Sequence, residues 1–178
     1  MNIVFVEVGY PGPSGKVGGA GIYVRNFGKQ LVKIGYNVSA ICSRMENKSN
    51  MYKDGLITVY PIIATNPSKL IYYISRVPLL KVFSRLLFYI HNGFKVYRFL
   101  LGLNKSFKID YIEYTEGGDF WNALTKKFKY SSHLHGSPYT FMNQSKKLKG
   151  KAYWISRRVE HFFIKRANKV VSPSYAML

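Results

Sequence analysis

The sequence contains a single cysteine, Cys42, among its 178 residues. One thiol cannot form a disulfide within the chain, and a metal site built from several cysteines is excluded. A chain of this kind fits a reducing compartment. We therefore expect a cytoplasmic protein whose stability comes from an ordinary hydrophobic core.

Long apolar runs are also lacking, because no stretch reaches the roughly 18 uncharged apolar residues that a membrane-spanning helix needs. The longest apolar region, residues 77–103, is interrupted by Lys81, Arg85, Lys95 and Arg98. The first residues have neither the basic start nor the apolar length of a secretory signal. These absences predict a soluble protein or one that is peripheral at the inner face of the cell membrane.

Acidic residues are scarce, since 8 Asp and Glu stand against 27 Lys and Arg and give a formal net charge of +19 at pH 7. Such a field attracts nucleic acid, an anionic membrane surface or a substrate that carries phosphates, and it does not distinguish among them. No helix-turn-helix, zinc-finger or RNP sequence is present. We therefore expect no specific nucleic-acid binding.

Apolar residues make up 47% of the chain, and their spacing predicts alternating strands and helices. Short apolar runs predict strands over residues 3–6, 37–42, 56–63, 111–114, 130–134 and 169–172. Helical spacing predicts helices over residues 20–34, 67–103, 119–128 and 145–167. This alternation is typical of an α/β, Rossmann-like domain with a mostly parallel sheet and helices on both faces. We expect residues 1–178 to form one such domain.

The first predicted helix shows the clearest apolar face. Val24, Phe27, Leu31 and Ile34 fall at helical spacing, so we expect them to face the core together. Gly35 follows directly and is suited to end the helix in a left-handed backbone conformation.

A glycine-rich segment, residues 9–21, joins the first strand to this helix. Glycines let backbone N–H groups approach a phosphate, and a helix N-terminus favours negative charge. The segment does not match GxGxxG, since Val24 occupies the third glycine position, nor a P-loop, since Val17 follows Lys16. It is either a phosphate-binding loop at the carboxyl end of the first strand or a surface loop without a ligand.

Half of the acidic residues gather within ten positions: Asp110, Glu113, Glu116 and Asp119. Asp110 is placed to start a strand, and Asp119 is placed to cap the next helix. Glu116 is then the member best placed to bind a sugar hydroxyl or act as a base. Chance clustering is the alternative.

Two histidines, His133 and His135, close the next strand and point to the same side of it. They could share a metal in principle, but no third ligand lies nearby in the sequence, and we expect no metal. His135 stands at the strand tip before a Gly-Ser-Pro turn. There it would face the same crevice as the glycine-rich segment, unless its role is structural.

A basic helical surface is interleaved with aromatic residues. Its members are Lys69, Arg76, Lys81, Arg85, Lys95, Arg98, Lys105 and Lys108, with Tyr72, Tyr73, Phe88 and Tyr89 between them. Such a surface is either a membrane-interfacial helix or a solvated charged face above a core-facing apolar stripe.

Four segments carry a family resemblance through their order and spacing. They are residues 18–38 (GGAGIYV through LVKIGYNV), 110–114 (DYIEY), 134–137 (LHGS) and 167–174 (ANKVVSPS). Together they resemble the N-terminal half of glycosyltransferase family 4, whose members are retaining enzymes of the GT-B fold. Tyr36 and Asn37 replace the usual His-Glu of the first segment, and Asn168 replaces an Asp in the last.

The resemblance implies a glycosyltransferase that moves a sugar, with retention, from a nucleotide-sugar donor to a saccharide or lipid-linked acceptor. Family members often build lipopolysaccharide, capsule and glycolipids, so it implies a role in cell-surface polysaccharide or glycolipid synthesis. It assigns His135 as catalytic and places Gly18 and Gly19 near the donor phosphates. Glu116, Tyr114, Tyr10 and Lys16 would line the acceptor side. Neither a metal nor a cofactor besides the nucleotide sugar is implied.

The family's second domain, which binds most of the donor nucleotide, is absent from these 178 residues. We expect it in cis or on a partner chain, and we expect this domain alone to be inactive. The sequence does not identify the donor, the acceptor or the linkage. Two alternatives remain open: a non-catalytic membrane- or polyanion-binding module of the same fold, and half of a nucleotide-sugar epimerase.

Overall fold

The computed structural model describes residues 1–7, 9–11, 18–42, 51–62, 81–115, 118–134 and 151–172. Its strands are β1 (Asn2–Glu7), β2 (Asn37–Cys42), β3 (Tyr52–Asp54), β4 (Ile57–Pro61), β5 (Tyr111–Tyr114), β6 (Tyr130–His133) and β7 (Lys169–Val171). Its helices are α1 (Gly19–Lys33), α3 (Lys81–Ser106), α4 (Phe120–Thr125) and α6 (Lys151–Arg166). The predicted helical residues 67–80 and 145–150 lie outside these ranges.

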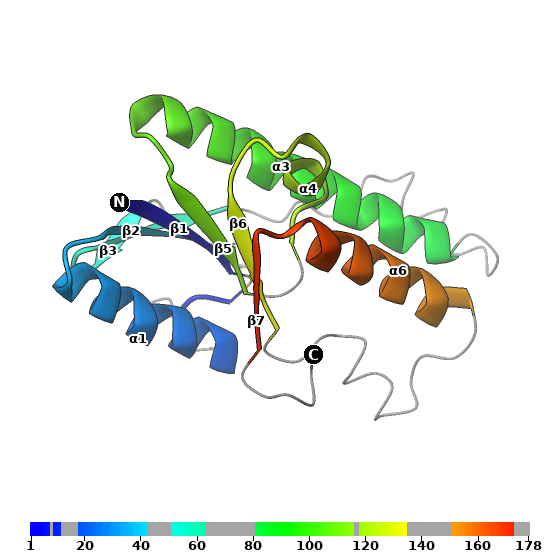
Figure 1. The fold of residues 1–178 in the computed structure, drawn as a ribbon, viewed down its shortest axis with the longest axis horizontal. Coiled ribbons are helices and arrows are strands. Elements are labelled where there is room, and N and C mark those ends of the chain that lie inside the picture. Colours follow the sequence, from blue (N-terminus) through cyan, green and yellow to red (C-terminus); the bar gives the residue numbers. More distant parts are fainter. Residues whose placement is uncertain are drawn as a thin grey trace.

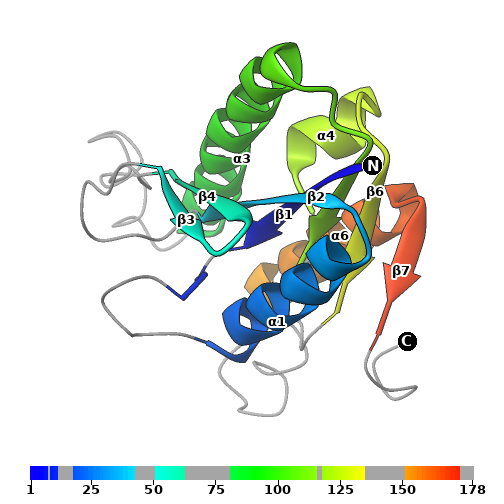
Figure 2. The same ribbon diagram turned by 90° about the vertical axis from the view of Figure 1, so that its left-hand side faces the viewer.

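The strands form one seven-stranded sheet in the order β3-β4-β2-β1-β5-β6-β7 (Figure 1). All neighbouring strands are parallel except β3 and β4. Helix α1 covers one face, and α3, α4 and α6 cover the other (Figures 1 and 2). The predicted fold class, α/β with a mostly parallel sheet and helices on both faces, is confirmed.

The hydrophobic core is split by the sheet into two clusters. Side chains alternate between the two faces of a strand, so neighbouring residues of β1 join different clusters. Val4 packs on the α3 side with Leu100, and Phe5 packs on the α1 side with Val24. Helices on both faces explain why the central strands are apolar runs and not alternating patterns.

Helix α1 lies close to the sheet because glycine occupies its inner face. Gly28 is buried beside Val24, and a Cβ on Gly28 would come within 3.0 Å of Ile57 Cδ1. The contact line therefore runs through Gly28, and the prediction that Ile34 faces the core is wrong, since that side chain is 70% exposed. Gly35 ends the helix at φ +90°, as predicted.

Strand β3 was not predicted from the sequence. It pairs with β4 in antiparallel fashion through a turn in which Gly55 has φ +63°. A strand of three residues is too short to display an apolar alternation. The hairpin places Asp54 beside α1.

The short helix α4 follows the predicted start but not the predicted end. Asp119 caps it, accepting a 2.8 Å hydrogen bond at Oδ1 from the backbone N–H of Asn122. Lys126 adopts a left-handed conformation with φ 52° and ends the helix before residue 128. The side chain of Asn122 then binds the backbone of Phe128, which directs the chain into β6.

The longest helix, α3, has 26 residues and carries its buried side chains on the face toward the sheet. Among the helices that the structure describes, α3 included, none is both long enough and apolar enough to cross a membrane.

Candidate active site

One rim of the sheet gathers the carboxyl ends of β1, β5 and β6, because these neighbouring strands are parallel. Helix α1 begins beside this rim, and the turn after it leads back to the start of β2 at the opposite rim. The chain builds the sheet outward from β1 in both directions, first through β2 and later through β5. Ligands of open α/β sheets bind at such a reversal, outside the carboxyl ends of the strands.

At this rim, the N-terminus of α1 has no side-chain cap among the residues that the structure describes. Gly18 is the N-cap residue, no side chain caps the helix, and its first turn contains no acidic residue. The backbone N–H groups of that turn have no acceptor within the helix, and they carry the positive end of the helix dipole. Among the described residues, a Cβ on Gly18 or Gly19 would meet no atom within 4 Å. Packing against the described residues therefore does not require glycine here, and a backbone without a Cβ would let an anion approach closely.

A buried polar cluster lies next to this helix start. The Tyr23 hydroxyl of α1 donates a 3.0 Å hydrogen bond to Oε1 of Glu113 in β5. The same oxygen lies 3.2 Å from Nδ1 of His133, the last residue of β6. Tyr23 and His133 also meet edge to face, with ring centroids 4.6 Å apart. Burial, followed by the charge of Glu113 and the hydrogen bond to it, raises the pKa of Tyr23, so its hydroxyl stays a donor.

Sequence reasoning noticed Glu113 and His133 but did not join them. Glu113 was counted in an acidic cluster, His133 was weighed as a metal ligand, and Tyr23 was not singled out. The available signal was an acid inside an apolar strand followed by a histidine at the end of the next strand. Their shared face depends on the strand register. Glu113 pairs with Ser131, and His133 follows Ser131 by two residues, so the side chains of Glu113 and His133 lie on the same face of the sheet.

A second cluster joins Tyr10, near the start of the glycine-rich segment, to Asp54 of β3 and Arg25 of α1. The Tyr10 hydroxyl donates to Asp54 Oδ2 at 3.1 Å, and Arg25 Nε lies 2.7 Å from the same oxygen. Burial would raise the pKa of Asp54, but hydrogen bonds from Arg25, Tyr10 and Lys29 outweigh it and lower that pKa. Tyr10 is only 2% exposed, so its side chain belongs to the core beside α1.

Tyr114 lies on the other face of the sheet, because it follows Glu113 in the same strand. It is 3% exposed and packs edge to face on Tyr130 at 5.4 Å. Burial and the charge of Asp119 raise the pKa of its hydroxyl. Burial also raises the pKa of Asp119 itself, to about 7. The structure thus brings Tyr114 to Asp119 and Tyr130 and not to Gly18.

Three predicted site residues, His135, Glu116 and Lys16, lie outside the described residues. The chain can be followed to Leu134, whose backbone N–H donates to Val171 at 2.8 Å. In the described segments, no three His, Cys, Asp or Glu side chains gather in a way that could hold a metal ion.

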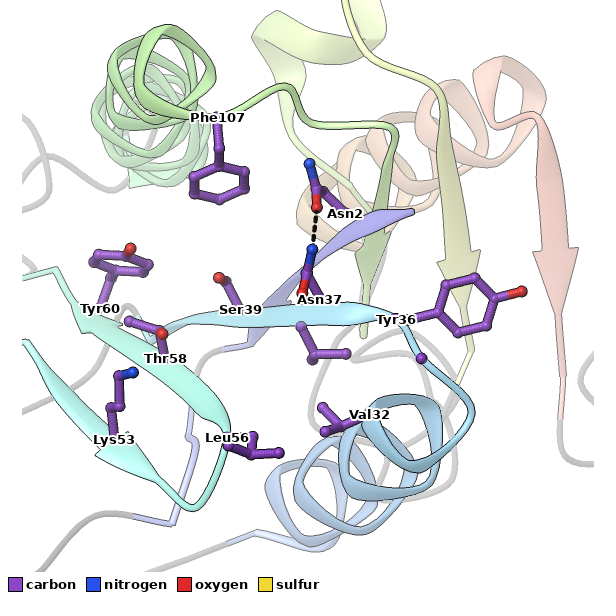
Figure 3. Close-up of a pocket in the computed structure, with 12 residues that line it drawn as sticks. Asn2, Val32, Tyr36, Asn37, Ser39, Lys53, Leu56, Thr58, Tyr60 and Phe107 are labelled. Atoms are coloured by element: carbon purple, nitrogen blue, oxygen red, sulfur yellow. Dashed lines mark hydrogen bonds between the residues drawn. The ribbon is translucent and has the colours of Figure 1, made fainter.

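A shallow hollow lies at the opposite, amino-terminal rim (Figure 3). Asn37 donates to Asn2 at 2.9 Å there, and Asn2 donates to the Lys108 carbonyl at 2.6 Å. Phe107 and Tyr60 stand at its side (Figure 3). The two amides are used to hold the strand ends together, so we place the candidate active site at the carboxyl rim instead.

Comparisons with known proteins bear on the family and the fold of this chain. The family model for Glycosyltransferase Family 4 matches residues 17–178. No curated protein sequence matches the chain. The structure of sucrose-phosphate synthase from Thermosynechococcus elongatus is similar, with 16% identity and a TM-score of 0.60 over 96% of this chain and 42% of that chain. A second structure of that enzyme is similar with 14% identity and a TM-score of 0.53, over 99% of this chain and 78% of that chain. At such identities the likeness concerns the fold, and this chain spans less than half the length of the first structure.

Proposed function

The chain belongs to glycosyltransferase family 4, and we propose that it forms the acceptor-side half of an enzyme that transfers a sugar from a nucleotide-sugar donor. The acceptor is a hydroxyl of a saccharide or a lipid-linked saccharide. The observation that carries the proposal is the N-terminus of α1 at Gly18 and Gly19, which lacks a side-chain cap among the described residues and lies on the rim where β5 and β6 end.

The proposed chemistry explains why an open helix start is useful. Transfer breaks the bond between the anomeric carbon and the donor phosphate oxygen, and it forms a bond from that carbon to the acceptor oxygen. The nucleoside diphosphate leaves with the bonding electrons, and the acceptor hydroxyl loses its proton. Backbone N–H groups and the dipole of α1 stabilise the charge that develops on the leaving phosphate. This proposal requires no cofactor besides the nucleotide sugar.

We propose His135 as the catalytic residue next to the transferred sugar, with Glu116 and Lys16 on the acceptor side. Its position in the sequence supports this role, because His135 comes two residues after the end of β6, and that strand end lies at the rim where α1 begins. We leave Tyr10 and Tyr114 out of the acceptor side, because both side chains are buried.

The donor-binding half is proposed to come from a second domain, in cis or on a partner chain. This view is supported by the likeness to sucrose-phosphate synthase, of which this chain covers 42%. Every activity measurement below therefore uses the full-length protein together with any partner chain that copurifies with it.

We also propose a peripheral place at an anionic membrane, in cell-surface polysaccharide or glycolipid synthesis. The net charge of +19 supports it, as does α3, where Arg98 lies 5.9 Å from the ring of the partly exposed Phe94. Sedimentation with phosphatidylglycerol vesicles should exceed that with phosphatidylcholine vesicles and should fall with added salt. Equal sedimentation with both at low salt would rule out this setting.

The decisive experiment compares Gly19→Ala with Gly102→Ala in α3. At both positions a Cβ meets no atom within 4 Å in the described structure, so both variants should fold. Release of nucleoside diphosphate is measured with UDP-, GDP- and ADP-sugars. We expect Gly19→Ala to lower kcat/KM about tenfold, because the added Cβ would hold the phosphate away from a backbone N–H and so weaken one hydrogen bond. Gly102→Ala should match the wild type.

Equal activity of the two variants would contradict the role of the α1 start. The alternatives predict other products. A binding module would release no nucleoside diphosphate from any donor, and an epimerase would convert a nucleotide sugar to its epimer in the absence of an acceptor.

A further inference from the structure

We propose that Glu113 is a positioning residue that fixes the start of α1 relative to the end of β6 by accepting from Tyr23 and His133 at one carboxylate oxygen. This inference rests on the proposed function, because these two chain segments flank the proposed donor and sugar positions. Glu113 itself is not placed in contact with a substrate.

The bridge matters because α1 packs mainly on the other half of the sheet. Its principal sheet contacts are with β1, β2 and β4. Strand β6 is separated from β1 by β5. The hydrogen bond from Tyr23 and the contact of His133 with the same oxygen, at 3.0 and 3.2 Å, connect α1 to this second half. Tyr23 lies in the second turn of α1, and His133 is the last residue of β6, next to the rim.

The chemistry of the cluster favours one fixed arrangement. A buried carboxylate is costly unless donors surround it, and Glu113 is only 9% exposed. Its Oε1 accepts from the Tyr23 hydroxyl, so His133 must present Nδ1 as a second donor. This requirement selects one imidazole tautomer, or the imidazolium, and one ring orientation. Apolar side chains would fill the same space at lower cost, so a carboxylate here points to geometric control.

Substitutions that keep the shape of the cluster test this control. Glu113→Gln replaces one carboxylate oxygen by an NH₂ group and removes the charge, so it weakens the hydrogen bonds that Oε1 accepts. Tyr23→Phe removes only the hydroxyl and keeps the ring against His133 and Phe27. The matched control is Tyr97→Phe, which removes a hydroxyl with a 3.0 Å hydrogen bond to Thr125 on the far face of the sheet.

The experiment is made on the full-length protein. It measures kcat and KM with UDP-, GDP- and ADP-sugars, the thermal midpoint, and the imidazole ¹⁵N shifts of His133. Because misplacement of groups by about 1 Å can cost a hundredfold in rate, we expect Glu113→Gln and Tyr23→Phe to lower kcat by about ten- to a hundredfold. Their thermal midpoints should stay near that of Tyr97→Phe. In the double variant, the fold-decrease in kcat should be smaller than the product of the two single fold-decreases.

The ¹⁵N shifts should show a protonated Nδ1 on His133 in the wild type and a changed signal in Glu113→Gln. The inference is overturned if kcat in both variants equals that of Tyr97→Phe, or if Nδ1 of His133 carries no proton in the wild type. Should Glu113→Gln fail to fold, Tyr23→Phe decides the matter. A wild type that turns over none of the donors contradicts the proposed function instead. The tautomer and the coupling of Tyr23 to Glu113 in thermal stability then still test the bridge.

Discussion

The hydroxyl of Tyr10 donates a 3.1 Å hydrogen bond to Oδ2 of Asp54, across 44 positions of the sequence. Arg25 and Lys29 of α1 bind the same carboxylate at 2.7 and 3.4 Å. One acidic side chain in a three-residue strand thus joins the start of the glycine-rich segment to helix α1.

Replacing Asp54 should therefore destabilise the domain. Asp54→Ala leaves the buried Tyr10 hydroxyl without its acceptor, which should lower the free energy of unfolding by about 1–3 kcal/mol. Urea denaturation measures the change. Tyr10→Phe is the matched variant, because it removes the donor of the same hydrogen bond. In the double variant, Tyr10→Phe should recover part of the stability that Asp54→Ala loses. Independent, additive effects of the two substitutions would contradict the pairing.

The same carboxylate predicts a response to acid. The pKa of Asp54 is lower in the folded chain than its ordinary value, so its stabilising contribution is complete above that ordinary value of about 3.9. The contribution is lost as the pH falls through the folded pKa. Asp54→Ala should therefore lose less stability than the wild type between pH 5 and the acid range. Parallel curves in this range would refute the prediction.

Asp119 should act in the opposite sense. Burial raises its pKa from 3.8 to about 7, so between these values the folded chain holds a proton that the unfolded chain has released. Its contribution is complete below pH 4 and falls as the pH rises to about 7, by at most about 4 kcal/mol. Asp119→Asn, which still caps α4, should remove this fall. Urea denaturation at five pH values from 4 to 8 measures the free energy of unfolding of both proteins. The same pH dependence in wild type and variant would contradict the prediction.

Gly93 and Gly102 provide a matched pair on α3. A Cβ on Gly93 would lie 2.7 Å from Asp119 Oδ2, whereas one on Gly102 would meet nothing within 4 Å among the described residues. Gly93→Ala should displace the capping carboxylate and lower stability by about 1–3 kcal/mol. Gly102→Ala should raise stability by up to about 1 kcal/mol, as helix propensity dictates. Thermal denaturation compares the two, and Asp119→Ala should relieve part of the Gly93→Ala effect.

The sheet was predictable because its central strands are buried on both faces. Residues 3–6 are an apolar run, and residues 37–42 and 111–114 are short, mostly apolar segments, so each can be recognised as a strand without knowing its partner. Capping by Asp119 was predictable for a similar reason, since it depends on residues three positions apart. Features fixed by local chemistry can be read from a single sequence.

The remaining features depend on distances that the sequence does not contain. Tyr23, Glu113 and His133 meet only through the strand register and the placement of α1. The exposure of Ile34 follows from the close approach of Gly28 to Ile57, which shifts the inner face of the helix. The burial of Tyr10 needs the unpredicted β3. Gly18 and Gly19 lie at the start of α1, and their place near a donor phosphate stays a prediction.

The uncapped first turn of α1 also bears on how the protein should be handled. Spare backbone donors at a helix start attract any small oxyanion, so phosphate or sulfate in a buffer would compete with the donor. Such ions would raise the melting temperature by occupying the folded state alone. Purification and assay in chloride with an amine buffer, which supplies no oxyanion, would then give tighter binding of the proposed donor and a lower melting temperature.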